Sequence, residues 1–109
     1  MEFLVRTENR LPPHTAADER DRLRAAERAR ADELREAGIL RRLWRVPGRG
    51  GTIGLYEAAD ATELHDALAS LPMFPWMEII VEPLATHPQE RGGGPGRAAV
   101  VQSRTAAPS

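Results

Sequence analysis

The sequence has no cysteine and no lysine among its 109 residues. Without cysteine there can be no disulfide bond and no thiol chemistry, which excludes a disulfide-framed secreted module and favours a reducing cytoplasm. Without lysine, all fifteen basic residues are arginines, so no side chain can form a Schiff base with a carbonyl substrate.

Long apolar runs are also missing. Residues 77–81 form one of the longest, and Glu78 interrupts it, whereas a membrane-spanning helix needs about 20 apolar residues. The first residues, Met-Glu-Phe-Leu-Val-Arg, have neither the basic start nor the apolar run of a signal peptide. We therefore expect a soluble, cytoplasmic protein that does not associate with membranes.

The chain has little net charge, −1 in all. Residues 91–109 contain three arginines and no acidic residue, so the remainder of the chain is acidic overall. A nucleic-acid-binding protein would present a basic face. The charge therefore argues against a nucleic-acid partner.

Few side chains could act as nucleophiles or metal ligands. Ser70 has no nearby histidine partner, and the other two serines lie near the C-terminus. His14, His65 and His87 fall in separate segments without metal-ligand spacing. We therefore expect no metal site, which leaves carboxylates for proton transfer and arginines for binding anions.

The alternation of apolar and polar residues predicts four strands and two helices in the order βαββαβ. Thr15 and Asp18 resemble a capping box at the start of the first helix, Gly38 would end it, and Asp60 or Thr62 can cap the second helix. The expected elements are a strand over residues 2–8, a helix over about 15–37, a hairpin over 39–46 and 52–57, a helix ending before Pro72, and a strand over 77–84.

This order is that of the ferredoxin-like α+β sandwich, in which two helices cover one face of an antiparallel sheet. The other sheet face is left open, and in so short a chain its usual cover is a second subunit. We expect one domain over residues 1–88. Residues 89–109, rich in glycine, proline and alanine, are expected to form a flexible tail.

Glu27 is the carboxylate that helical spacing places among leucines. At 100° per residue it lies about 40° from Leu23 and about 20° from Leu34 around the first helix. A carboxyl group in such surroundings is desolvated, and its pKa rises towards values that suit a general base. The alternative is a structural ion pair with Arg30 or with an arginine of the sheet.

Two further segments contain candidate binding residues. In the first predicted hairpin strand, strict alternation sends Arg41 and Arg45 to one face and Trp44 to the other. Arginine there suits a carboxylate ligand, although exposed arginines and a core tryptophan are the alternative. Phe74 and Trp76 lie in a proline-rich corner that could form the wall of a pocket or a subunit contact.

Several segments together resemble one known family. They are Arg41-Arg42-Leu43-Trp44-Arg45, Gly48, Glu63-Leu64-His65, the Leu-Pro-Met-Phe-Pro-Trp-Met-Glu-Ile run of residues 71–79, and Leu84 with His87-Pro88. The family is muconolactone isomerase, and the similarity extends almost without gaps over residues 1–88, with Leu11-Pro12 and Glu27 at matching places.

The resemblance implies a dimeric α+β barrel that assembles into a higher oligomer, a decamer in this family, and an enzyme without cofactor or metal. Members convert (+)-muconolactone to the 3-oxoadipate enol-lactone in the β-ketoadipate pathway of aromatic catabolism. By resemblance, Glu27 would move the proton and Arg41 or Arg45 would hold the substrate carboxylate. Trp44, His65, Phe74 and Trp76 would complete the binding site.

One segment departs from the family pattern. After Gly48 the family typically continues His/Arg-Tyr-Ala-Asn-Tyr-Ser, whereas this chain has Arg-Gly-Gly-Thr-Ile-Gly at residues 49–54. The substrate therefore stays open between muconolactone and a larger apolar intermediate of a natural-product pathway, on which a related cyclase or isomerase would act. A third alternative is a non-catalytic oligomeric module, in which Glu27 would be fully paired and no cavity would adjoin it.

Overall fold

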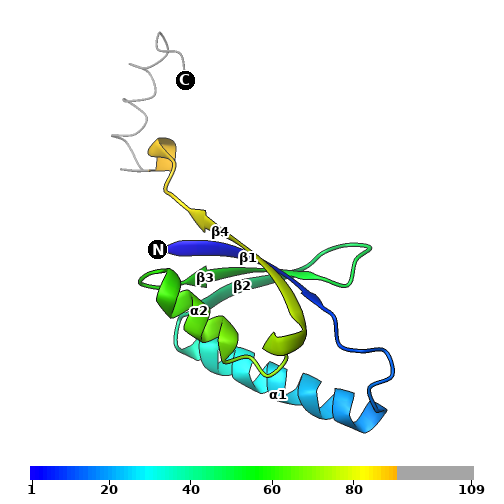
Figure 1. Cartoon of the computed structure of the whole chain (residues 1–109). Helices are drawn as coiled ribbons and strands as arrows, with labels where there is room; N and C mark the ends of the chain where they lie inside the picture. The colour runs from blue at the N-terminus through cyan, green and yellow to red at the C-terminus, as the bar shows by residue number, and fades with distance from the viewer. Residues whose placement is uncertain (91–109) are drawn as a thin grey trace.

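The computed structural model describes residues 1–90, and in them the predicted order βαββαβ is confirmed (Figure 1). Two short 3-10 helices, η1 and η2, accompany the main elements. Most of the predicted tail, residues 91–109, lies outside the described residues. The bounds are β1 Glu2–Asn9, α1 Ala17–Glu36, β2 Leu40–Arg45, β3 Thr52–Glu57, α2 Ala61–Ala69, η1 Phe74–Trp76, β4 Met77–Leu84 and η2 Pro88–Glu90.

The four strands form one antiparallel sheet in the order β2-β3-β1-β4. Strands β1 and β3 are central, and both helices lie on the same side of the sheet (Figure 1). This is the ferredoxin-like α+β arrangement that the sequence predicted. No helix in residues 1–90 combines the length and the apolar character that crossing a membrane requires.

Helix α1 starts later than predicted. Its N-cap residue is Ala16, whose methyl side chain cannot accept a hydrogen bond, and the Thr15 hydroxyl donates to the Pro12 carbonyl at 2.7 Å. The predicted capping box of Thr15 and Asp18 is therefore wrong. The predicted stop is confirmed: Gly38 adopts φ 78°, a left-handed conformation that glycine takes without steric cost.

Helix α2 is capped by Asp60, one of the two residues that the sequence offered for this position. The Asp60 carboxylate accepts a hydrogen bond from the Glu63 backbone N–H at 2.9 Å, and the Glu63 carboxylate accepts one from the Ala59 N–H at 2.9 Å. The Glu63 N–H is one of the donors that a helix start leaves unpaired, and the Ala59 N–H lies just before the cap, so the two contacts together resemble a capping box. This fixes where α2 begins and hence where it delivers the chain to the following turn.

The strand register divides the sheet residues between two faces. Phe3, Val5 and Thr7 of β1 lie opposite Tyr56, Gly54 and Thr52 of β3, and this set faces the helices. The hydrophobic core forms between this face and the helices, and its buried members include Phe3, Val5, Leu34, Leu40, Tyr56, Leu64, Leu68 and Leu71.

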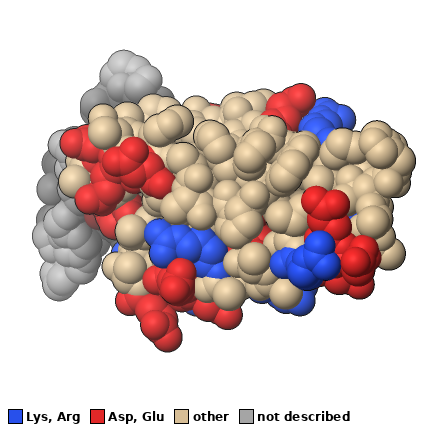
Figure 2. Space-filling view, turned by 60° about the horizontal axis from the view of Figure 1, so that its bottom comes forward, with Lys and Arg blue, Asp and Glu red and all other residues tan. Residues whose placement is uncertain are grey.

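The opposite face of the sheet has no covering element among residues 1–90. Its apolar side chains include Trp44, 41% exposed, Ile80, 56% exposed, and Leu84, 40% exposed. The open sheet face thus leaves several large hydrophobic side chains in water. Figure 2 turns forward the bottom of Figure 1, where the helices lie, so it shows the side of the molecule opposite to this open face.

Candidate functional site

A cavity of about 250 Å³ lies between α1 and the helix-facing side of the sheet. Most of its lining is apolar and comes from every strand, from α1 and from the turn after α2. The polar side chains that line it are those of Thr7, Asn9, Glu27, Arg28, Thr52 and Tyr56. A largely apolar pocket with a few convergent polar groups is the usual form of a small-molecule site.

Glu27 reaches this cavity from α1, as its helical position predicted. Ala31, one turn further along, lines the same cavity, and Leu34 is buried in the core. One carboxylate oxygen, Oε1, accepts a hydrogen bond from the Met73 backbone N–H at 3.0 Å. The turn after α2 therefore orients the carboxylate from across the cavity.

The alternative of a structural ion pair at Glu27 is not met within residues 1–90, where this carboxylate has no cationic partner. Arg30 instead donates to the Ser70 hydroxyl at 2.8 Å and contacts Glu33 at 3.0 Å. Burial raises the pKa of Glu27 above its ordinary value of 4.5, and the hydrogen bond from Met73 lowers that pKa by less. The result is a carboxylate that is oriented but poorly solvated.

Two ionisable residues of the cavity besides Glu27 were not singled out from the sequence. Arg28 adjoins Glu27 on α1, and Tyr56 contacts the cavity from β3. Arg28 is exposed and has no acidic partner within residues 1–90. The spacing of Glu27, Arg28 and Ala31 on one side of a helix could have indicated Arg28, and Tyr56 alternates with Gly54 on the helix-facing side of its strand.

The three predicted binding residues of β2 do not line this cavity. The pairing of β2 with β3 is irregular between Leu40 and Arg42, so Arg41 has no partner in the register. This bulge breaks the strict alternation that the sequence prediction assumed. Arg45 lies opposite Thr52 on the helix-facing side but is exposed, and Trp44 lies on the open face with the Arg42 guanidinium 5.3 Å from its ring centre.

His65 and Phe74 lie together in a different place. Their rings meet edge to face with centres 6.0 Å apart, and they line a hollow of about 360 Å³ between α2 and β4. Trp76 is half-buried, and its carbonyl accepts a hydrogen bond from the Arg10 N–H at 2.7 Å. Within one chain, none of these three aromatic rings lines the Glu27 cavity.

The divergent segment 49–54 approaches the cavity as a hairpin loop and the start of β3. Gly50 and Gly54 line the cavity. Gly51 packs so closely against β1 that an added Cβ would lie 2.7 Å from the Thr7 carbonyl oxygen. Small residues here therefore widen the cavity and allow close packing of the loop.

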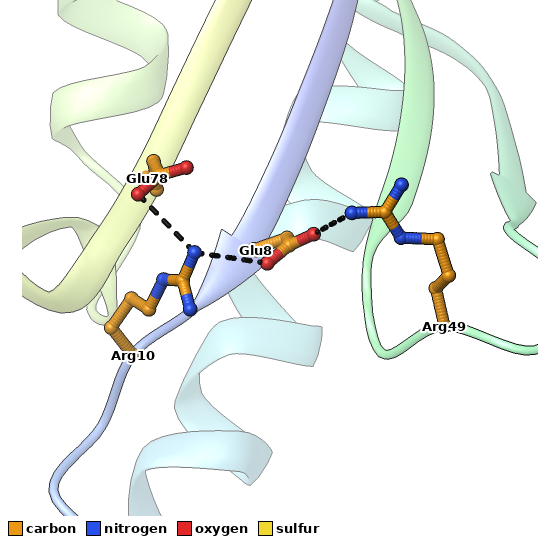
Figure 3. Close-up of polar contacts among 4 residues, drawn as sticks. All are labelled: Glu8, Arg10, Arg49 and Glu78. Carbon is orange, nitrogen blue, oxygen red and sulfur yellow. Dashed lines mark hydrogen bonds and ion pairs between the residues drawn. The ribbon is translucent and has the colours of Figure 1, made fainter.

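Ion pairs on the open side hold this loop against the sheet (Figure 3). The Arg49 guanidinium contacts Glu8 at 3.0 Å, and Glu8 also contacts Arg10 at 3.2 Å. Arg10 in turn contacts Glu78 of β4 at 3.3 Å. Exposed pairs of this kind each contribute little stability, but together they connect the loop with β1 and β4.

Nothing in residues 1–90 brings three or more acidic or histidine side chains together as a metal site. The chain matches the family model described as "Muconolactone delta-isomerase" over residues 1–90. It is 39% identical over 88 residues to the Muconolactone Delta-isomerase of Cupriavidus pinatubonensis, covering 81% of this chain and 96% of that protein. It is 35% identical over 85 residues to the enzyme of the same name from Rhodococcus opacus, covering 78% of this chain and 91% of that protein.

Solved structures give a consistent result. A crystal structure of muconolactone isomerase matches with a TM-score of 0.79 and 32% identity, over 86% of this chain and 98% of that one. A 5-chloro-2-hydroxyhydroquinone dehydrochlorinase from Burkholderia phenoliruptrix matches with a TM-score of 0.60 at 21% identity, over 80% and 96% of the two chains. The second likeness concerns the fold alone, since one fold supports different reactions.

Proposed function

Because the chain belongs to the muconolactone delta-isomerase family, we propose that it isomerises an unsaturated lactone of the muconolactone type without a cofactor. One observation carries the proposal beyond the family: a desolvated carboxylate, Glu27, lines a largely apolar cavity and is oriented by a backbone N–H. A general base that removes a proton from carbon needs both a fixed position and a raised pKa, because a raised pKa makes the carboxylate more basic.

The proposed reaction moves one proton and one double bond. The Glu27 carboxylate removes the proton from C4 of the butenolide ring, and the electrons of that C–H bond shift through the ring to give a dienolate. Negative charge develops on the carbonyl oxygen of the lactone as the proton leaves. The protonated Glu27 returns the same proton at C2, which leaves the double bond between C3 and C4 and restores the carboxylate.

A lactone of this type has a carboxylate side chain, for which Arg28 is the arginine that lines the cavity. Arg41 and Arg45 remain the candidates on β2 that the family resemblance suggested. We expect Arg28→Met to raise KM with a smaller fall in kcat, the pattern of lost uniform binding. Arg41→Met and Arg45→Met should change KM less, and the reverse order would assign the carboxylate to β2.

The larger-substrate alternative is favoured by a specific feature, the glycines of segment 49–54. Gly50 and Gly54 leave space beside the cavity where the family typically has bulkier residues. A biosynthetic cyclase or isomerase acting on a bigger apolar lactone would use that space. Comparing kcat/KM for muconolactone with that for ring-alkylated butenolides separates the two substrates.

The non-catalytic alternative is disfavoured, because a cavity adjoins Glu27 and no cation pairs with its carboxylate within residues 1–90.

The direct test follows muconolactone turnover by ultraviolet absorbance. Glu27→Gln keeps the size of the side chain and removes the base, so we expect kcat to fall by at least about 10²-fold, the usual worth of acid–base catalysis. Glu36→Gln, an exposed glutamate of the same helix, is the matched control and should retain activity. Full activity in Glu27→Gln would transfer the role of base to another group.

We also propose that the protein acts as a homo-oligomer in the cytoplasm. The oligomer is supported by the uncovered apolar sheet face and by the assembly that the family resemblance implies. The compartment is supported by the absence of cysteine from the sequence.

A further inference from the structure

The polar groups of the Glu27 cavity are not equally available to a ligand. The hydroxyls of Thr7 and Thr52 are hydrogen-bonded to each other at 2.8 Å. The Asn9 side chain accepts from the Leu11 N–H at 2.9 Å and donates to the Met73 sulfur at 3.9 Å. Each of these three side chains therefore already has a hydrogen-bond partner within the protein.

Tyr56 is the exception among the uncharged polar groups of the cavity. Its side chain belongs to the core, with only 5% of the residue exposed, yet its hydroxyl makes no hydrogen bond with any group of residues 1–90. The hydroxyl is also not sealed inside protein, since no fully enclosed, unpaired side-chain oxygen exists in that part of the chain. It therefore opens into the cavity, where leaving a donor unpaired costs free energy.

The ring of Tyr56 is held in a defined position. A Cβ added at Gly54 would lie 2.8 Å from the Tyr56 Cε1 and 3.5 Å from the Leu43 Cδ1. The ring thus lies against the bare backbone of Gly54, in space that any larger residue would occupy. This packing fixes the orientation of the Tyr56 ring, and hence the position of its hydroxyl, although the hydroxyl makes no hydrogen bond within residues 1–90.

Glu27 and Tyr56 line the cavity from opposite layers of the fold, Glu27 from helix α1 and Tyr56 from strand β3 of the sheet. We propose that the Tyr56 hydroxyl donates a hydrogen bond to the lactone carbonyl oxygen, on which negative charge develops when Glu27 removes the proton. This rests on the proposed function, which it deepens by adding a second catalytic residue. Donors aimed at a developing oxyanion in a desolvated site are among the largest contributions to catalysis.

The acidity of the phenol agrees with a donor role. Burial, and to a smaller extent the nearby Glu27 charge, raises the pKa of Tyr56 to about 12. The hydroxyl accordingly keeps its proton near neutral pH and cannot replace Glu27 as the base. Its proton is available to a negatively charged oxygen, and it stays on Tyr56 during the reaction.

The first test measures binding and needs no turnover. Tetronate, the anion of 4-hydroxy-2(5H)-furanone, is a five-membered lactone enolate and serves as the probe. Glu27→Gln mimics the protonated acid that accompanies the dienolate, so calorimetry compares Glu27→Gln with Glu27→Gln/Tyr56→Phe. We expect the second variant to bind tetronate at least about tenfold more weakly, as for a lost hydrogen bond to a charged group.

The neutral lactone 2(5H)-furanone is the matched control ligand, and its affinity should fall by a smaller factor. Equal tetronate affinity in the two variants, or no binding to either, overturns the proposal. Tyr56 is the single tyrosine of the chain, so 3-fluorotyrosine labels this position alone. Its fluorine resonance should shift on adding tetronate to the labelled Glu27→Gln protein, and an unmoved resonance also overturns the proposal.

The second test is kinetic. In Tyr56→Phe we expect kcat for muconolactone to fall roughly 10²-fold, with an unchanged melting temperature and an unchanged acid limb of the pH profile. An acid limb that moves, with kcat recovered at higher pH, would mean that Tyr56 acts on Glu27 and not on the lactone. If the natural protein does not turn over muconolactone, the proposed function fails, and the tetronate measurement still decides the role of Tyr56.

Discussion

At the scale of single residues, the protonation of Glu27 connects burial with both activity and stability. Burial raises the pKa of this carboxyl group above 4.5. We expect kcat/KM to fall on the acid side as pH drops through that raised pKa, because only the carboxylate can accept the proton. A pH profile of kcat/KM measures this limb, which Glu36→Gln should leave in place.

Stability should change in the opposite direction. The folded state holds the Glu27 proton more tightly than the unfolded state, so its contribution to stability is complete below pH 4.5 and is lost as pH rises through the raised pKa. Glu27→Gln removes this dependence. Melting temperatures measured against pH should show natural protein and variant diverging with rising pH in favour of the variant, and a constant difference would contradict this.

Gly54 shows how one missing side chain shapes the cavity. An alanine Cβ there would come within 2.8 Å of the buried Tyr56 ring, so the ring must move. We expect Gly54→Ala to destabilise the fold by about 1–3 kcal/mol, the usual effect of overpacking, and to lower activity. Thermal melts measure the first effect. Gly50→Ala is the control for stability, because its Cβ would meet nothing within 4 Å.

At the scale of elements, helix α2 depends on its cap. The Asp60 carboxylate accepts a hydrogen bond from the Glu63 backbone N–H at the helix start. No other side chain in residues 1–90 accepts a hydrogen bond from that N–H. We expect Asp60→Ala to cost about 1 kcal/mol of unfolding free energy. Chemical denaturation measures it, with Asp66→Ala on the exposed side of the same helix as control. Equal losses in both variants would show that the cap contributes nothing.

The strand β2 shows how one irregularity redirects an element. Simple alternation predicted that Arg41 and Arg45 share a face. The bulge at Arg41 lets both Leu40 and Leu43 lie opposite helix-facing residues of β3, which serves the core because both leucines contact the cavity. Sequence spacing cannot indicate a bulge of this kind, since it arises from pairing with a strand that lies further along the chain.

At the scale of the whole molecule, the uncovered sheet face predicts association. Ile80 of β4 is 56% exposed on that face, and placing a charge there would oppose burial against another subunit. We expect light scattering to give an oligomer for the natural protein and a 12.0 kDa species for Ile80→Asp.

Val81→Asp is the control for this experiment, because the next residue of the strand points to the other face and the change in charge is the same. An Ile80→Asp variant that assembles like the natural protein would locate the interface elsewhere. A natural protein of 12.0 kDa in solution would remove the proposed oligomer altogether.

The sequence by itself determined the order of elements, the antiparallel α+β class and the position of Glu27 on the inner side of α1. These depend on local properties, namely propensity, turn residues and helical period, which act within a few residues. The stop at Gly38 and the cap at Asp60 belong to the same group. Family membership also followed from the sequence, because the Leu-Pro-Met-Phe-Pro-Trp-Met segment is distinctive.

Only the tertiary structure decided which side chains share the Glu27 cavity. Tyr56 and Glu27 are far apart in the sequence and meet because β3 pairs with β1 beneath α1, while His65 and Phe74 are drawn to a separate hollow. The Met73 N–H that orients Glu27 comes from a turn 46 residues away. Such contacts depend on strand register and helix packing, and no local pattern encodes the distance between groups so widely separated along the chain.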